Sequence, residues 1–396
     1  MKRSALLFGA LMLGAANAAS AQGLSMQMSN GWTFSFAGNV NIFAMYQKVS
    51  DGDATGSPGQ LVGSTEAKGL YYGTGLLPAF ATFSAMGKEG NTNLGVHFGF
   101  APQVQCGGNA HDCFGGEFSG ASIDMRQVYM TVGGDWGTIT AGRELGVYQR
   151  SNILNDQTLF GVGGGGIAPR GTTLGRIGFG YVYPNFVPQF TYSSPAGRST
   201  SFNIGLMEPS TFASYTELTT PRIEAEVSFK AGSNLNVFVG GTAQNGKDPV
   251  ADESKTAVGV NGGLTYQGST VSVHGSGYYG KGIGTTLMFG GLAGFDEDAD
   301  PTTGDDLSKS YGYFGQLTFT PAGSKATIAG SYGSSFLSND GDNFKTENSL
   351  ISGGVYYQAT KSLKMVFEGD YMWSKDKDGS GKNKAFTGAF GLMLFY

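Results

Sequence analysis

The chain ends in a long alternating segment, and this segment constrains the fold more than any other feature. In "AFTGAFGLMLFY" (385–396), one face carries Phe386, Phe390, Leu392, Leu394 and Tyr396. The opposite face carries small or neutral residues. Twelve residues at about 3.3 Å each span roughly 40 Å, or about 28 Å of depth at a tilt of ~45°. Soluble cores use strands of ~5–6 residues, whereas a transmembrane barrel carries an apolar band of ~25 Å. The segment therefore predicts a membrane-spanning β-barrel.

Composition supports this fold class. The 396 residues include 67 Gly, and only 14% are charged, against about 7% Gly and about 25% charge in ordinary proteins. The 28 Phe, 19 Tyr and 3 Trp suit long strands flanked by aromatic girdles at the membrane interfaces. We expect an all-β antiparallel barrel that occupies residues 22–396.

The first residues predict export. "MKR" is a basic start, "SALLFGALMLGAA" is an apolar run, and "ASA" at 19–21 is a small-residue cleavage site. We therefore expect a signal peptide over 1–21, with "ANA" at 16–18 as an alternative cleavage site. The apolar run is too short to span a membrane, which disfavours an N-terminal anchor.

Alternation divides the chain into strands separated by short turns and by long polar intervals. Long loops on one side and short turns on the other are typical of an outer-membrane barrel. Proline cannot donate to a strand ladder, so Pro78, Pro184 and Pro188 indicate a bulge, an edge or a misplaced boundary. The predicted strands number sixteen: 32–47, 69–87, 92–104, 121–133, 137–143, 175–194, 200–208, 222–230, 235–244, 255–267, 269–281, 309–320, 325–336, 347–359, 362–374 and 384–396.

Strand parity separates charged residues from apolar ones. In 222–230, Ile223, Val227 and Phe229 share one face, and in 362–374 Phe367 and Tyr371 do the same. A charge on the lipid face would cost up to ~2–4 kcal/mol at mid-membrane, so we assign the charged faces to a water-filled interior. The predicted lumen residues are Arg222, Glu224, Glu226, Lys230, Lys364, Glu368 and Asp370.

The two cysteines lie close together in "CGGNAHDC". In an oxidising compartment we expect a disulfide between Cys106 and Cys113, with a metal pair including His111 as the alternative. The acid-rich segment 296–306 could bind calcium or magnesium at the membrane surface, although an unbound loop is the simpler reading. We predict no cofactor, no resident metal, no enzyme activity and, from the acidic balance of 30 Asp and Glu against 25 Lys and Arg, no nucleic-acid partner.

Several patches resemble the general porin family of Gram-negative outer membranes. "RQVYMTVGGDWGTITAGRE" (126–144) is similar to the family's fourth strand, turn and fifth strand, and "LGRIGFGYVYPNF" (174–186) to the strand after its third loop. The terminal aromatic strand resembles the family's assembly signal, which implies that Phe390, Leu392, Leu394 and Tyr396 are read by the outer-membrane insertion machinery.

The resemblance implies that the third loop, roughly 144–173, folds inward and constricts the pore. It places Arg143 and Arg176 on the wall. Parity supports Arg176, which shares a face with Gly178 and Gly180, whereas strict alternation points Arg143 outward and leaves Arg126 ambiguous. The acidic segment typical of the family's loop is missing, so the predicted constriction consists of Arg143, Arg176, Asp156, Glu144 and Arg126.

The sequence thus predicts an outer-membrane channel for passive diffusion of ions and small hydrophilic solutes. Five acidic residues are expected to face the interior, against four basic ones, and this excess predicts a weak cation preference. The acids are Glu224, Glu226, Glu368, Asp370 and Asp156, and the bases are Arg176, Arg222, Lys230 and Lys364. The resemblance implies a homotrimer in contact with the lipid bilayer and lipopolysaccharide. The alternative is a substrate-selective outer-membrane channel of the same architecture.

Overall fold

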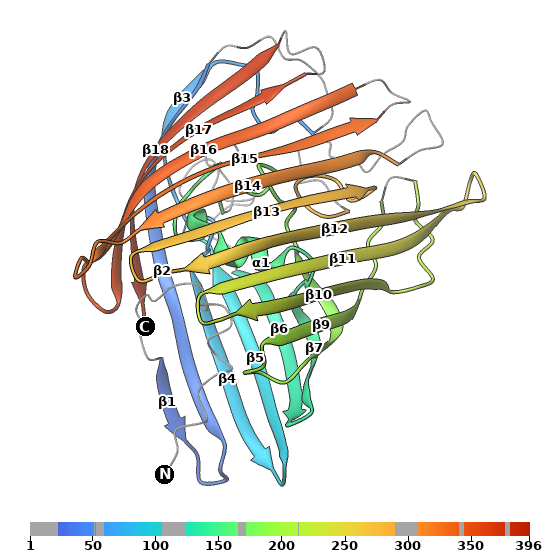
Figure 1. The fold of residues 1–396 in the computed structure, drawn as a ribbon, viewed down its shortest axis with the longest axis vertical. Helices are drawn as coiled ribbons and strands as arrows, with labels where there is room; N and C mark the ends of the chain where they lie inside the picture. Colours follow the sequence, from blue (N-terminus) through green and yellow to red (C-terminus); the bar gives the residue numbers. More distant parts are fainter. Residues whose placement is uncertain are drawn as a thin grey trace, which may run out of the picture.

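The computed structural model describes residues 23–50, 52, 59–104, 123–164, 172–212, 214–289, 307–339, 344–376 and 381–396. Within these residues a single antiparallel sheet closes on itself into a barrel with sixteen strand positions (Figure 1). The barrel closes where β18 (Lys382–Phe395) pairs with β2 (Thr33–Ser50), with Phe395 opposite Asn39 and Lys384 opposite Ser50. The predicted fold class is therefore confirmed.

From β4 to β18 each wall strand pairs with the next strand in the chain, including β9 with β10, whereas β3 pairs, among the described strands, only with β2. A short strand, β1 (Leu24–Gln27), pairs with the part of β2 that extends past the C-terminal residue. The other strands are β3 (Ala67–Gly73), β4 (Phe80–Glu89), β5 (Thr92–Pro102), β6 (Ile123–Gly134), β7 (Gly137–Leu145), β8 (Phe186–Ser193), β9 (Thr200–Met207), β10 (Arg222–Ala231), β11 (Leu235–Asp248), β12 (Glu253–Gln267), β13 (Val271–Lys281), β14 (Lys309–Phe319), β15 (Ala326–Asn339), β16 (Phe344–Gln358) and β17 (Leu363–Lys375).

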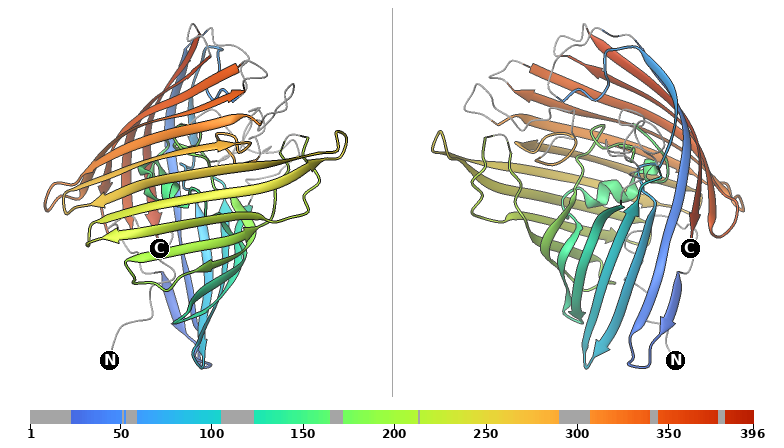
Figure 2. Two further views of the ribbon diagram at one scale, coloured as in Figure 1. Left: turned by 45° about the vertical axis from the view of Figure 1, so that its right-hand side comes forward. Right: turned by 180° about the vertical axis from the view of Figure 1, so that it is seen from behind.

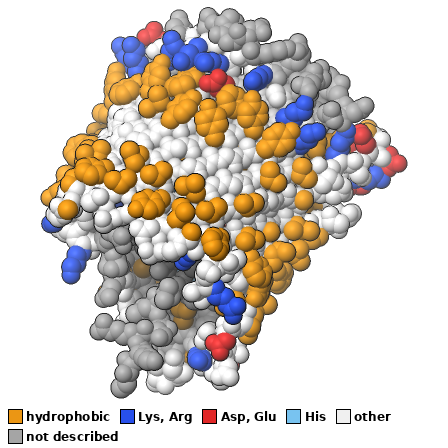
Figure 3. Space-filling view, in the orientation of Figure 1, with side chains coloured by type: hydrophobic (Ala, Val, Ile, Leu, Met, Phe, Trp, Pro, Cys, Tyr) orange, Lys and Arg blue, Asp and Glu red, His pale blue; other side chains and the backbone are white. Residues whose placement is uncertain are grey.

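The two faces of the wall follow the alternation of the sequence. On β10, Ile223, Val227 and Phe229 are about half exposed, while Arg222 and Glu224 are buried on the opposite face. The outer surface accordingly carries a broad band of apolar side chains (Figure 3). Such a band fits a hydrocarbon environment, where large apolar side chains replace the polar surface of a soluble protein.

The second wall position is interrupted at its proline. β3 and β4 both pair with β2, and residues 74–79 between them leave the wall. The side chain of Asn41 donates to the Leu77 carbonyl at 3.0 Å, and that of Asn39 donates to the Pro78 carbonyl at 3.2 Å. Proline has no N–H to donate to a ladder, and side-chain donors of β2 satisfy the carbonyls of Leu77 and Pro78 where this segment leaves the wall.

The strand predicted over 175–194 is wrong in its first half. The wall strand β8 begins only at Phe186, and residues 172–185 run through the barrel interior. The parity that points Arg176 inward would point Ile177, Phe179 and Tyr181 outward, but all three are buried. Alternation cannot reveal this, because a segment enclosed by protein on every side buries both of its faces.

The interior also holds two short helices, α1 (Arg150–Asn155) and η1 (Gln157–Phe160). Figure 2 shows α1 inside the curved wall. No helix in the described part of the chain is long and apolar enough to cross a membrane. We call residues 146–185, as far as they are described, the inward segment.

Candidate pore constriction

The start of the inward segment is held by two carboxylates of β10. Glu224 accepts hydrogen bonds from the backbone N–H groups of Val147 and Tyr148 at 2.7 and 2.9 Å, and Arg222 lies 3.0 Å from its other oxygen. Glu226 accepts a hydrogen bond from the Ser151 hydroxyl at 2.7 Å. Charged hydrogen bonds to backbone N–H groups are strong, so β10 fixes the point at which the chain leaves the wall.

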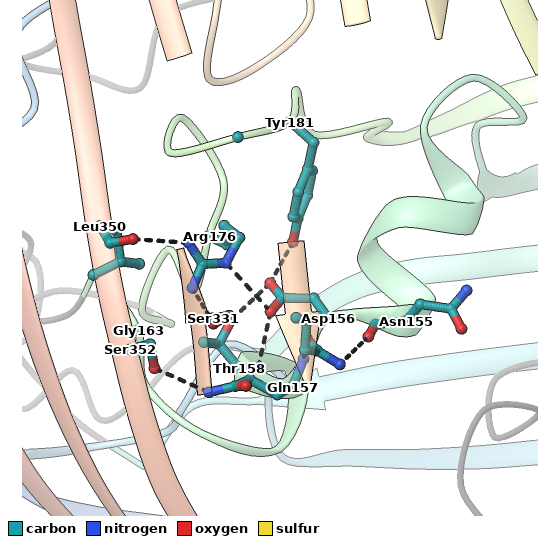
Figure 4. A network of polar contacts seen from close by, with 12 residues as sticks. Asn155, Asp156, Gln157, Thr158, Gly163, Arg176, Tyr181, Ser331, Leu350 and Ser352 are labelled. Atoms are coloured by element: carbon teal, nitrogen blue, oxygen red, sulfur yellow. Dashed lines mark hydrogen bonds and ion pairs between the residues drawn. The ribbon is translucent and has the colours of Figure 1, made fainter. Parts of the chain in front are cut away.

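Asp156 organises the middle of the inward segment (Figure 4). Its carboxylate accepts from the Thr158 backbone N–H at 3.0 Å, from the Thr158 hydroxyl at 2.6 Å and from the Tyr181 hydroxyl at 2.9 Å. Burial, reinforced by the Asp156 carboxylate, raises the pKa of Tyr181 well above its ordinary value. The phenol therefore keeps its proton and donates to Asp156.

The same part of the segment is attached to β14 and β16. Gln316 accepts from the backbone N–H of Gln157 at 2.6 Å and donates to the Asn155 carbonyl at 2.9 Å. The Gln157 side chain reaches the Ser352 hydroxyl at 3.3 Å. Gln316 and Ser352 were not among the predicted site residues, although both are polar residues on the inward parity of predicted strands.

Arg176 lies in the interior, but on the inward segment and not on the wall. Its guanidinium donates to the Leu350 carbonyl at 3.1 Å and to the Ser331 hydroxyl, and its Nε lies 3.9 Å from Asp156. The Arg176 side chain is fully buried. The prediction that Arg176 lies on a wall strand is therefore wrong. Its guanidinium instead connects the inward segment, at Asp156 and at Arg176 itself, to β15 and β16.

A third anchor lies on β17. Glu368 accepts from the backbone N–H groups of Val162 and Gly163 at 2.6 and 2.7 Å, and its other oxygen accepts from the Tyr356 hydroxyl. The Lys364 ammonium lies 3.8 Å from the centre of the Phe160 ring, which is a cation–π contact.

The charged wall residues are therefore covered to a large degree. Arg222, Glu224, Glu226, Lys364, Glu368 and Asp370 are each at most 6% exposed. The sequence argument expected these residues to line water. In the structure the inward segment lies against them, and most of them hydrogen-bond to it or to one another. Lys230 differs, because it is exposed at the short-turn end of β10.

An open cavity of about 1180 Å³ lies on the other side of the interior, along β4 to β9. Leucines of the inward segment and of residues 76–77 border it, together with polar side chains of β6 and β7 such as Gln127, Thr131 and Thr140. It reaches the short β8–β9 turn at 195–198. The cavity thus lies beside the inward segment.

Arg126 borders this cavity because of an irregularity in the wall. The β5–β6 register shifts at Gly99, so that Gln127 and Met125 have partners on β5 and Arg126 has none. Its Nε lies 2.6 Å from Asp124, and its guanidinium lies 5.9 Å from the Phe186 ring. The bulge resolves the ambiguity that parity left for Arg126.

Arg143 and Glu144 lie at the end of β7. Arg143 is opposite Val128 in the register and exposed, it donates to the Phe186 carbonyl at 2.8 Å, and it contributes to the cavity edge. Glu144 faces the cavity and accepts from the Gln127 amide at 3.1 Å and from the Leu145 backbone N–H at 2.7 Å.

Some predicted features lie outside the described residues. These are the signal peptide at 1–21, the pair Cys106 and Cys113, and the acid-rich segment 296–306. Among the residues that are described, no group of three or more His, Cys, Asp or Glu side chains could hold a metal ion.

The strand that resembles an assembly signal lies at the closure of the barrel. Phe390, Leu392 and Leu394 face outward and are 38–50% exposed. Tyr396 exchanges two backbone hydrogen bonds with Gly38, at 3.0 and 3.1 Å, and its ring lies 5.1 Å from that of Phe36.

Comparisons with known proteins agree with this architecture. The outer-membrane channel DcaP of Acinetobacter baumannii superposes with a TM-score of 0.66 at 16% identity, over 94% of this chain and 99% of that one. The anion-selective porin from Comamonas acidovorans gives 0.60 at 14%, over 92% and 100%. The trimer form of in-vitro folded OmpT from Vibrio cholerae gives 0.55 at 14%, over 92% and 100%.

These identities establish a shared fold. No protein with a curated description matches the chain significantly. The family model described as Gram-negative porin matches residues 5–379, which is nearly the whole chain. The family match and the closed barrel together place the protein in the outer membrane. The chain belongs to the Gram-negative porin family.

Proposed function

We propose that the chain forms a water-filled channel for passive diffusion of ions and small hydrophilic solutes, and that the inward segment is its constriction. The observation that carries the proposal is the pairing of a firmly anchored segment with an open cavity of about 1180 Å³ beside it. Glu224, Glu226 and Glu368 hold the segment against one side of the barrel. The space that remains on the other side limits solute size.

The ion preference follows from the charges that border the cavity. The sequence count predicts weak cation preference, but four of its five acids lie on the wall under the inward segment, and the fifth, Asp156, is buried within that segment. The described cavity lining contains the bases Arg126, Arg143, Arg150, Arg198 and Lys230 and the acids Asp124, Asp135 and Glu144. Because charge rings near a narrow passage tune ion entry, we propose a weak anion preference in place of the cation preference. The Comamonas relative is described as anion-selective.

We also propose a homotrimer in the outer membrane, in contact with lipopolysaccharide and assembled by the insertion machinery that reads the last strand. The trimer form of OmpT, which shares the fold, supports the oligomeric state.

A substrate-selective channel remains the second candidate, and one observation favours it. The cavity is bordered by Leu76, Leu77, Leu154, Leu159 and Leu174, which is an apolar lining for a route of hydrophilic solutes. A solute with an apolar part would bind there and block the current.

Planar-bilayer recording of the purified protein tests these proposals. We expect current steps in groups of three, a conductance that rises linearly with potassium chloride, and a small reversal potential of anion-selective sign under a salt gradient. A cation-selective sign would overturn the role of the cavity charges. Saturating conductance or block by one solute would favour the selective channel, and the absence of steps would overturn the channel itself.

A further inference from the structure

Asp370 differs from the other buried acids of the wall. Glu224, Glu226 and Glu368 each accept hydrogen bonds from the inward segment. Asp370 follows Glu368 by two residues on the same face of β17, and its side chain is fully buried. In the described part of the chain neither of its carboxylate oxygens has a hydrogen-bond partner, and no Lys, Arg or His side chain lies within ion-pair distance of them. Buried charges are normally paired or bound to a metal ion, so this carboxylate lacks a partner that its burial requires.

A second buried oxygen without a partner lies beside Asp370. In the register of the sheet, Asp370 is opposite Thr387 of β18 on one side and Ser352 of β16 on the other. Residues directly opposite each other in an antiparallel pair have Cβ atoms about 4.5–5.5 Å apart, so the three side chains are neighbours on the inner face. The Thr387 side chain is fully buried, and among the described residues its hydroxyl has no hydrogen-bond partner either.

The inward segment brings a further oxygen to the same place. The Gln157 amide donates to the Ser352 hydroxyl at 3.3 Å (Figure 4). The Oε1 atom of Gln157 is buried and has no partner in the part of the chain that the structure describes. Asp370, Thr387 and Gln157 together therefore present four unpartnered oxygens, two from the carboxylate, one from the hydroxyl and one from the amide. Buried polar atoms in this state call for a bound water or ion.

The surroundings keep bulk water away from these oxygens. On one side along β17, Met372 is fully buried in an apolar cluster that includes Leu61 and Phe179. On the other side, the docked backbone of residues 162–163 covers Glu368. The occupant of the site is therefore enclosed by the protein when the inward segment is docked.

The charges buried around the site indicate the charge of its occupant. The acids are Asp156, Glu368 and Asp370, and the bases are Arg176 and Lys364. Three acids against two bases leave a net charge of −1 when all five groups are ionised. An unbalanced charge in the interior is costly. One monovalent cation restores neutrality, whereas a divalent ion would leave an excess positive charge.

We propose that Asp370, Thr387 and Gln157 bind one alkali-metal cation, such as sodium, between the inward segment and the wall. Carboxylate and amide oxygens are ligands that hard cations prefer in proteins. The site combines one acid with neutral oxygens, so it differs from a group of three or more His, Cys, Asp or Glu ligands, which the described residues lack. The proposal departs from the expectation, drawn from the sequence, that the chain has no resident metal.

The cation connects the inward segment to the wall strands, because its ligands come from both. An ion that binds the folded barrel and not the unfolded chain increases the stability of the fold as its concentration rises. The stability of this barrel should therefore depend on sodium itself and not only on ionic strength.

Thermal unfolding of the purified full chain in detergent tests the proposal, with sodium chloride exchanged for choline chloride at constant ionic strength. The unfolding midpoint of the wild type should rise with the sodium concentration. D370N removes the charge and should abolish this dependence. T387V removes one oxygen at nearly constant volume and should raise the sodium concentration of the half-maximal shift roughly tenfold, whereas T387S keeps the hydroxyl and should respond as the wild type does.

E224Q is the matched control. It also neutralises a buried acid of the wall, but one that lies 3.0 Å from Arg222, so its midpoint should fall while its sodium dependence stays that of the wild type. A wild-type midpoint that does not change with sodium would overturn the proposal and assign a proton or a water to Asp370. A sodium response of D370N and T387V equal to that of the wild type would also overturn it. Because unfolding is measured and not conductance, the outcome is independent of the proposed function.

Discussion

Individual buried carboxylates of the wall anchor the inward segment by hydrogen bonds. Glu368 exemplifies this, because it accepts two backbone N–H groups of the inward segment from a position on the wall. Burial of a charge is costly unless hydrogen bonds satisfy it. The segment supplies those bonds, so that the charge and the segment stabilise each other.

Substitution of Glu368 by Gln tests this coupling. The amide keeps one acceptor but loses the charge, and we expect the docking of Val162 and Gly163 to weaken by about 1–3 kcal/mol. Single-channel records should then show more frequent current fluctuations with the mean conductance raised. E89Q, at an exposed turn, serves as the control, and a record of E368Q as quiet as that of the wild type would contradict the anchoring role.

Arg176 and Asp156 form the second residue-scale test. R176M leaves the buried Asp156 carboxylate without its cationic neighbour, and breaking a buried pair on one side costs about 3–5 kcal/mol. We expect a lower unfolding temperature for R176M and a smaller loss for R176M/D156N than the sum of the single variants. Strict additivity in a thermal-shift series would show that the two charges are not coupled.

Among the elements, most wall strands were predictable from alternation, the inward course of residues 144–173 came only from the family resemblance, and residues 174–185 were wrongly assigned to a wall strand. The wall strands follow from alternation because lipid on one side and protein on the other impose different residues on the two faces. Ile177, Phe179 and Tyr181 alternate in the same way, yet the segment that carries them is buried on every side. Arg126 could not be placed from sequence either, since its orientation depends on a register shift at Gly99.

Shortening the inward segment tests its role as an element. Replacement of residues 150–160 by three glycine or serine residues removes α1 and η1 but leaves every wall pairing in place. We expect a barrel that still assembles, a conductance raised severalfold, and weaker discrimination between small and large solutes in a liposome-swelling assay. A conductance equal to that of the wild type would show that the segment does not limit the passage.

At the scale of the whole molecule, the barrel depends on one seam, between β18 and β2. Its last ladder bonds join Tyr396 to Gly38. The register of β18 against β2 is continuous from Lys384–Ser50 to Phe395–Asn39, and the Tyr396–Gly38 bonds extend it to the last residue.

Deletion of Tyr396 tests that dependence. Two backbone hydrogen bonds and an aromatic contact with Phe36 are lost, and we expect less of the protein to reach the outer membrane in its heat-modifiable, folded form. Y396F keeps the ring and the backbone and should assemble normally. Equal assembly of the deletion and the wild type would show that the terminal residue is dispensable for closure.

The division of the interior into two halves has a consequence for how this protein can change. The anchors of the inward segment come from β10 and β14 to β17, whereas the cavity is bordered mainly by β4 to β9. Substitutions at Thr131, Thr138 or Thr140 can therefore reshape the cavity without loosening the anchors of the inward segment. The side chains that border the cavity and those that anchor the inward segment are thus mostly on separate strands, so the shape of the cavity can change, for example by laboratory redesign, while the anchors stay intact.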